Sequence, residues 1–185
     1  MADMDEAVLK RVLPHSIEAE QSVIGAMLMD REAITIASEQ INGEDFYGKQ
    51  YGILFDTMVE LNDEGKPVDL ITLQDRLKEK AVPPEIYSLE YIRDIMDTVP
   101  TSANIKYYAN IVAEKSVLRK LIKVNEEIAN NCYSQKETLE VLLEETEKKV
   151  FDIAQKRNNG DFVPIRQVVM LSLIHISEPT RLQLI

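Results

Sequence analysis

The run SANIKYYANIVAEKSVLRKLIKVNEEIANNC, residues 102–132, sets the architecture of this chain. It contains no proline or glycine, and its apolar residues recur at the spacing of one face of an α-helix. Those residues are Ile105, Tyr108, Val112, Leu118, Ile122 and Ile128. The pattern predicts one long helix with Ser102 as its N-cap. At 1.5 Å per residue, that helix would be about 45 Å long.

A second helix is predicted immediately after the first. Ser134 and Glu137 have the spacing of a capping box, in which each side chain bonds a free backbone amide at the start of a helix. Five residues then follow at helical spacing: Leu139, Leu143, Thr146, Val150 and Ile153. We therefore expect residues 101–156 to form a long helical hairpin that protrudes from the rest of the chain.

The apolar residues of this hairpin predict association. Each helix of a hairpin covers only one stripe of the other, so any further apolar residues need another surface. Ile122 and Ile128 on the first helix, with Val150 and Ile153 on the second, must contact the body, another copy of the chain or a different protein. The candidates for self-association are Tyr108, Val150 and Ile153.

Residues 16–100 predict a small globular body of short helices. Ser16 is typical of an N-cap, and Pro83-Pro84 and Pro100 interrupt the helical pattern. Residues 68–73 fit either a helix capped by Asp69 or a short buried strand, and we favour the helix because the apolar spacing continues beyond this segment. The predicted fold is all-α, a small helical body followed by a protruding hairpin.

The two ends of the chain lie outside this fold. We expect residues 1–15 to be a flexible N-terminal segment and residues 157–169, which contain a polar stretch ended by glycine, to begin a linker. Residues 171–181 resemble translated sequencing-adapter sequence, so we treat residues 170–185 as a tail of suspect origin.

Composition excludes several classes of function. With 185 residues, 45% of them hydrophobic, the chain can bury a core. One cysteine and two histidines disfavour disulfide, redox and zinc chemistry. The net charge of −11 disfavours unaided binding to nucleic acid, which attracts clustered cations. The sequence has no apolar run long enough to span a membrane, and its acidic start is unlike a signal peptide, so we expect a cytoplasmic protein.

A glycine-lysine loop is the nearest match to an enzymatic motif. Residues 43–50 fit the phosphate-binding loop pattern except at Gln50, which lacks the hydroxyl that ligates magnesium. Glu44 and Asp45 would also repel phosphate. We interpret the loop as a turn before a helix, and no catalytic, cofactor-binding or metal-binding residue is predicted.

A basic stretch on the long helix has two interpretations. It consists of Lys115, Arg119, Lys120 and Lys123. These cations could contact nucleic acid or an acidic protein. The alternative, which we favour, is a solvated face directed toward the more acidic second helix of the hairpin.

Several segments together resemble a known family. They are residues 16–28, Glu44–Tyr47, Val68–Leu70, residues 98–108 and Glu114–Arg119. In this order they are similar to signature segments of the N-terminal domain of bacterial replicative DNA helicases, the DnaB family. The resemblance covers roughly residues 11–169.

The resemblance implies an assembly. In this family, hairpins join domains into dimers, three dimers form a collar on a hexameric ring, and primase docks on the collar. The positions that resemble primase contacts are Tyr91, Ile122 and Ile128, although ordinary core or dimer packing would also explain them. Pro83-Pro84 departs from the glycine-rich turn that related sequences often have before the Tyr91 helix.

The resemblance also implies that catalysis lies elsewhere. ATP and magnesium bind the family's motor domain, which this sequence does not contain. We expect a noncatalytic homo-oligomer that binds primase, with a helicase loader as a further partner and DNA reached only through the intact helicase. The alternatives are a stand-alone helical adaptor that regulates a helicase and, less favoured, a small ATPase that uses the 43–50 loop.

Overall fold

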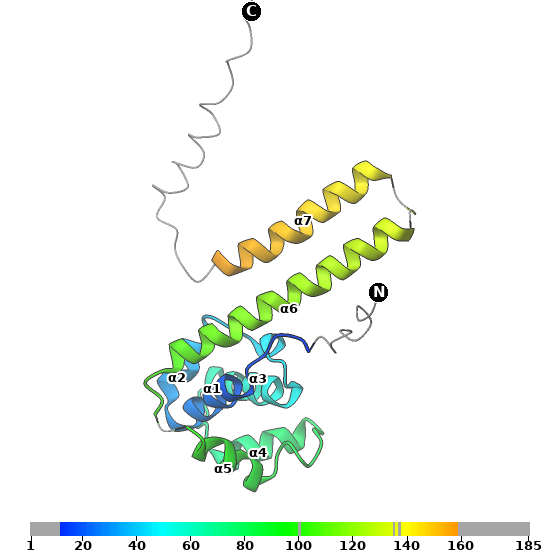
Figure 1. Ribbon diagram of the computed structural model, residues 1–185. Helices are drawn as coiled ribbons and strands as arrows, with labels where there is room; N and C mark the ends of the chain where they lie inside the picture. The colour runs from blue at the N-terminus through cyan, green and yellow to red at the C-terminus, as the bar shows by residue number, and fades with distance from the viewer. Residues whose placement is uncertain (1–11, 100, 135, 137, 159–185) are drawn as a thin grey trace, which may run out of the picture. The chain divides into compact units, whose positions relative to one another are not determined.

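The computed structural model describes residues 12–99, 101–134, 136 and 138–158, and every regular element in these residues is a helix (Figure 1). The elements are α1 (Ile17–Met29), α2 (Arg31–Ser38), the 3-10 helix η1 (Gly43–Asp45), α3 (Lys49–Asp63), α4 (Leu70–Glu79), α5 (Leu89–Asp97), α6 (Ile105–Ser134) and α7 (Leu139–Asn158). The all-α prediction is confirmed. The predicted N-terminal segment lies mostly outside the described residues, and the tail lies wholly outside them. Of the predicted linker, residues 157–169, only residues 157 and 158 are described, and they are the helical end of α7.

The chain divides into two compact units at the end of α6. The first unit ends at Ser134 and contains α1 to α6, and the second contains α7. The sequence placed the end of the body at residue 100. The first half of α6 nevertheless belongs to the core of the first unit, because Ile105, Ala109 and Val112 are buried there. The predicted pairing of the two long helices as a hairpin stays a prediction.

Helix α1 is the central element of the first unit. It packs against α2, α3, α5 and α6, and its residues Val23, Ile24 and Met27 are almost completely buried. The hydroxyl of Ser16 accepts a hydrogen bond from the N–H of Ala19 at 3.3 Å, so the predicted N-cap is confirmed. The cap therefore fixes where the core helix begins.

The segment that fitted either a helix or a strand is helical. Asp69 caps α4 by accepting hydrogen bonds from the N–H groups of Ile71 and Thr72, both at 2.9 Å. The hydroxyl of Thr72 accepts in return from the N–H of Asp69 at 3.0 Å. This reciprocal arrangement is a capping box, and it starts the helix.

Two other predicted caps are wrong. Ser102 is not the N-cap of α6, because α6 begins three residues later, at Ile105; its hydroxyl donates to the carboxylate of Asp30 at 3.3 Å. The N–H of Ile105 bonds the carbonyl of Ser102 instead. Ser134 does not start a second helix either: it is the last residue of α6, and its hydroxyl donates to the carbonyl of Asn131. Glu137, its expected partner, lies outside the described residues.

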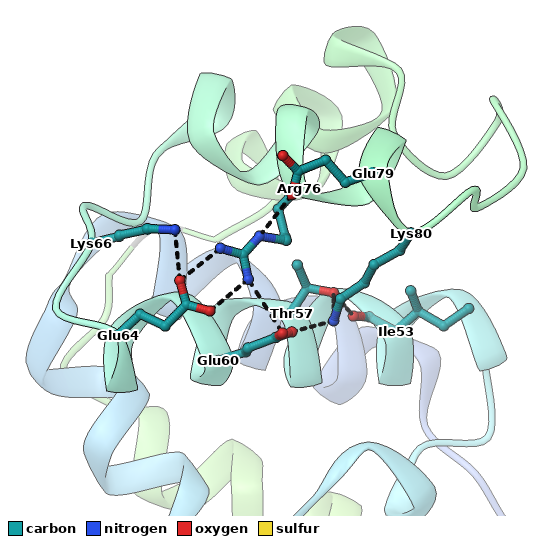
Figure 2. Close-up of polar contacts among 8 residues, drawn as sticks. All are labelled: Ile53, Thr57, Glu60, Glu64, Lys66, Arg76, Glu79 and Lys80. Carbon is teal, nitrogen blue, oxygen red and sulfur yellow. Dashed lines mark hydrogen bonds and ion pairs between the residues drawn. The ribbon is translucent and has the colours of Figure 1, made fainter.

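An ion-pair network joins α3 to α4 (Figure 2). The guanidinium of Arg76 donates to both carboxylate oxygens of Glu64, at 2.8 and 2.7 Å, and lies 3.2 Å from Glu60. Lys66 lies 2.7 Å from Glu64, and Lys80 pairs with Glu60. The bonds from Arg76 and Lys66 lower the pKa of Glu64 to about 2. A single exposed pair contributes little stability, but these pairs share their members and so form a connected link between the helices.

Helix α3 approaches the preceding turn closely at Gly52. A Cβ atom on Gly52 would lie 2.4 Å from the carbonyl oxygen of Gly43. A backbone oxygen cannot rotate away as the end of a flexible side chain can. Glycine is therefore required at this position for α3 to support the turn.

We expect Gly52→Ala to lower the free energy of unfolding by about 1 to 3 kcal/mol, the usual range for overpacking a core. Lys49→Ala, an exposed change on the same helix, is the matched control and should stay within about 0.5 kcal/mol of the unaltered chain. Urea unfolding followed by circular dichroism measures both. Equal stability of the two variants would contradict the close approach.

Candidate functional site

A cluster of polar side chains lies where α6 leaves the core. We call Asp45, Ser116, Arg119 and Lys120 the Asp45 cluster. The carboxylate of Asp45 accepts hydrogen bonds from the hydroxyl of Ser116 at 2.6 Å and from the ammonium of Lys120 at 2.5 Å. Arg119 donates to the backbone carbonyl of Asp45. Asp45 and Ser116 are both buried, so this contact is an interior one.

The pKa of Asp45 reflects two opposed effects. Burial raises it, because a charged carboxylate loses hydration in the interior. Hydrogen bonds from Lys120, Ser116 and the N–H of Asn42 lower it by more, so the pKa lies below its ordinary value. Asp45 is therefore an ionised group held inside the protein by its partners.

Arg119 also holds the segment that precedes α1. We call residues 12–15 the N-terminal strap. The guanidinium of Arg119 donates to the carbonyl of Pro14 at 2.7 Å and lies 6.0 Å from the centre of the Tyr47 ring. The ring of His15 stacks on Tyr47, with 4.2 Å between ring centres. One side chain of α6 thus binds both the strap and the turn that contains Asp45.

Carboxylates of the chain itself bind the backbone of residues 42–48, which we call the 42–48 turn. Glu20 is buried and accepts hydrogen bonds from the N–H groups of Tyr47 at 2.8 Å and Gly48 at 3.0 Å. Asp56 accepts from the N–H of Gly43 at 2.9 Å. The donors that a phosphate would need therefore already have carboxylate acceptors. The interpretation of this loop as a turn before a helix is confirmed.

The basic stretch is used differently from the favoured interpretation. Arg119 and Lys120 contact Asp45 and the strap, so for these two residues a solvated face toward the second long helix is wrong. The physical reason is that the buried carboxylate of Asp45 lies beside this part of α6 and is bonded by its side chains. Burial lowers the pKa of Arg119, while Glu20 and Asp45 favour its charged form.

A groove of about 280 Å³ lies between α6 and the segments that the cluster holds. Leu13 of the strap and Glu44 of the turn form one side. The other side consists of α6 residues: Ser116, Arg119, Lys120, Ile122, Lys123 and Glu126. The groove therefore has an apolar pair, Leu13 and Ile122, among charged groups of both signs.

The predicted partner-binding residues lie in different surroundings. Ile122 is half-buried in the groove, whereas neither Tyr91 nor Ile128 lines it. Tyr91 is half-buried on α5 and packs against the core. Burial and a hydrogen bond with Tyr51 raise the pKa of Tyr91. Ile128 is half-buried on the outer part of α6.

The predicted self-association residues are also distributed over two elements. Tyr108 is partly buried against the core of the first unit. Val150 is 44% exposed, and Ile153 is half-buried, both on α7. Further exposed apolar residues on α7 are Leu139, Leu143 and Phe151.

Glu20 and Asp45 organise the site but were not predicted from the sequence to do so. A signal for Glu20 was present, because it lies on the apolar face of α1 between Ile17 and Ile24. Ser116 likewise follows Ile105 and Val112 on one face of α6. A polar residue at a core position needs a bonding partner, so these positions pointed to an internal polar contact.

Within the described part of the chain, no group of three or more histidine, cysteine or carboxylate side chains is arranged to hold a metal ion. In the same part of the chain, no helix is both long and apolar enough to span a bilayer.

We expect Asp45→Asn to lower the free energy of unfolding by about 1 to 3 kcal/mol at pH 7, since hydrogen bonds to a charged group are lost. The folded-state pKa of Asp45 lies below its ordinary value, so the contribution is present above about pH 4 and is lost as pH falls through the folded-state pKa. Urea unfolding at several pH values measures it. Asp94→Asn, at an exposed carboxylate of α5, is the control, and a stability difference that does not shrink as pH falls below 4 would contradict the assignment.

Comparison with known proteins identifies a family match and close relatives. The family described as DnaB-like helicase N terminal domain matches residues 12–114. The replicative DNA helicase DnaB of Geobacillus stearothermophilus is 40% identical over 167 residues, which are 90% of this chain and 37% of that protein. The replicative DNA helicase DnaC of Bacillus subtilis is 38% identical over 175 residues, which are 95% of this chain and 38% of that protein. The chain thus spans less than two fifths of these relatives.

Solved structures share the fold. The N-terminal domain of DnaB helicase from Mycobacterium tuberculosis superposes with a TM-score of 0.72 at 30% identity, covering 76% of this chain and 99% of that one. A DnaB-like replicative helicase, studied with its interactions with primase, gives 0.61 at 20% identity and covers 91% of this chain and 36% of that one. The N-terminal domain of DnaB helicase from Helicobacter pylori, also studied with primase, gives 0.56 at 21% identity, covering 63% of this chain and 90% of that one.

Proposed function

Because the chain belongs to the family of DnaB-like helicase N-terminal domains, we propose that it serves a replicative DNA helicase as a noncatalytic collar domain that self-associates and docks primase. Two of the solved structures with the same fold were determined for proteins studied with primase. ATP-driven unwinding is assigned to the part of such helicases that this chain does not cover. The domain would act in the cytoplasm, and a helicase loader is a further candidate partner.

The observation that carries this proposal is the exposure of apolar side chains on the outer part of α6 and on α7. Leu118 and Tyr133 on α6 are 44% and 87% exposed, and Val150 and Phe151 on α7 are 44% and 60% exposed. Most helices in proteins are stabilised by packing an apolar face. Apolar residues left on long helices are therefore surfaces for association.

The charge of the chain supports protein partners over direct contact with DNA. The net charge is −11, and two cations of the basic stretch on α6, Arg119 and Lys120, contact the 42–48 turn. Phosphate binding needs clustered cations that can replace counterions. We therefore assign DNA contact to the intact helicase and not to this domain.

Primase docking is assigned to the face of α6 that contains Ile122. We expect Ile122→Asp to weaken binding of the cognate primase at least tenfold, about 1.4 kcal/mol, because a carboxylate would be desolvated against an apolar partner. Ile71→Asp is the matched control, since Ile71 is 74% exposed on α4. Isothermal titration calorimetry of the full chain measures both, and equal affinities would reject this surface.

Self-association is assigned to α7. We expect light scattering to detect a concentration-dependent dimer or larger species, with Val150→Asp raising its dissociation constant at least tenfold, about 1.4 kcal/mol. Gln155→Asp, an exposed change of the same charge on α7, should leave the constant unchanged. A strict monomer of the unaltered chain at high concentration would contradict the assignment.

A further inference from the structure

Helix α6 has a buried inner part and an outer part without buried residues. Its buried residues are Ile105, Ala109, Val112 and Ser116. From residue 117 to its end at Ser134, every residue of α6 is half-buried or exposed. This outer part of 18 residues is about 27 Å long at 1.5 Å per residue. Ser116 therefore marks the point where α6 leaves the core.

Asp45 binds α6 at this exit point. Ser116 and Lys120 lie four residues apart, on one face of the helix, and both donate to the same carboxylate oxygen. Arg119, between them, donates to the carbonyl of Asp45. Ser116, Arg119 and Lys120 thus make three contacts with Asp45 within little more than one helical turn. Together these contacts restrain both the tilt and the rotation of α6 at this point.

The 42–48 turn is itself held in place, so it can resist movement of the helix. Asp45 accepts a hydrogen bond from the N–H of Asn42 at 3.1 Å through its second oxygen. Glu20 of the central helix holds the other end of the turn through Tyr47 and Gly48. The anchor for α6 is thus connected directly to the core.

A small loosening of this anchor would have a large effect on the outer part of α6. A tilt of about 10° at Ser116 would displace the end of a 27 Å segment by about 5 Å. The groove would change shape as well. Arg119 holds the strap by its hydrogen bond to the carbonyl of Pro14, and Leu13 of the strap lines the groove.

We propose that Asp45 is a positioning residue for the partner-binding surface. It fixes the direction and rotation of the outer part of α6 and thereby places Ile122 opposite Leu13 and Glu44. This role rests on the proposed function, because the surface it positions is the one assigned to primase. Asp45 itself contacts no partner in this proposal and acts through α6.

The direction of α6 can be measured without any partner. One spin label is attached to Cys132, which is free and exposed near the end of α6, and the other to a cysteine introduced by Asp75→Cys on α4, at an exposed position. Double electron–electron resonance on the doubly labelled full chain, diluted in excess unlabelled chain so that distances between chains do not contribute, then gives the distance distribution between the two labels. We expect one narrow distribution for the unaltered anchor and a broad one after Asp45→Asn.

Lys120→Ala tests the same anchor from the helix side, at a residue whose side chain is 39% exposed, and it leaves Asp45 its hydrogen bond from Ser116. Lys123→Ala is the matched control, because Lys123 is an exposed cation that lines the groove about one turn further along α6 and is not among the residues that bond Asp45. We expect Lys120→Ala to broaden the distribution and Lys123→Ala to leave it narrow. Narrow distributions in both anchor variants would overturn the proposal.

Primase affinity gives the second readout. If about one molecule in ten keeps the competent orientation, the apparent dissociation constant rises about tenfold in the anchor variants. Unchanged affinity with a broadened distribution would overturn the positioning role. Failure of the unaltered chain to bind primase would instead overturn the proposed function, and the distance distributions would still decide whether Asp45 directs α6.

Discussion

The first unit depends on a buried carboxylate that must be bonded. Asp45 remains ionised in the interior because Ser116 and Lys120 donate to it and Arg119 binds its backbone. A buried charge without such partners would be very costly. This requirement joins the 42–48 turn to the middle of α6, and Glu20 of α1 holds the same turn through the N–H groups of Tyr47 and Gly48, so three distant segments meet. Three of the segments that resemble DnaB N-terminal domains, residues 16–28, 44–47 and 114–119, lie in these elements. We therefore interpret these three sequence motifs as parts of one structural contact.

The contact between Asp45 and Ser116 also lies where α6 changes from a core helix to an exposed one. Up to Ser116, α6 contributes buried residues to the core, and beyond it every residue of α6 is partly or fully exposed. The polar groups of the glycine-lysine loop are also used internally, since Glu20 and Asp56 accept hydrogen bonds from its backbone. These backbone donors are therefore already bonded within the chain.

The caps illustrate how far local sequence rules reach. Ser16 and Asp69 cap their helices as predicted, because their side chains bond amides two or three residues away. Ser102 and Ser134 are serines like Ser16, but they form different bonds. A serine hydroxyl can also donate to a nearby carboxylate or carbonyl. Local spacing identifies which residues are able to cap, and the available acceptors decide which of them do.

The sequence by itself determined the all-α fold, the helices that form the core and the apolar residues on the two long helices, because helical periodicity relates residues only three or four positions apart. The tertiary structure alone decided which groups meet. Asp45 and Ser116 are 71 positions apart, and Arg119 and Pro14 are 105 apart. No local spacing relates such residues, because their approach depends on how α1, the 42–48 turn and α6 pack. The same packing placed Ile122 beside Leu13 in a groove and left Tyr91 against the core.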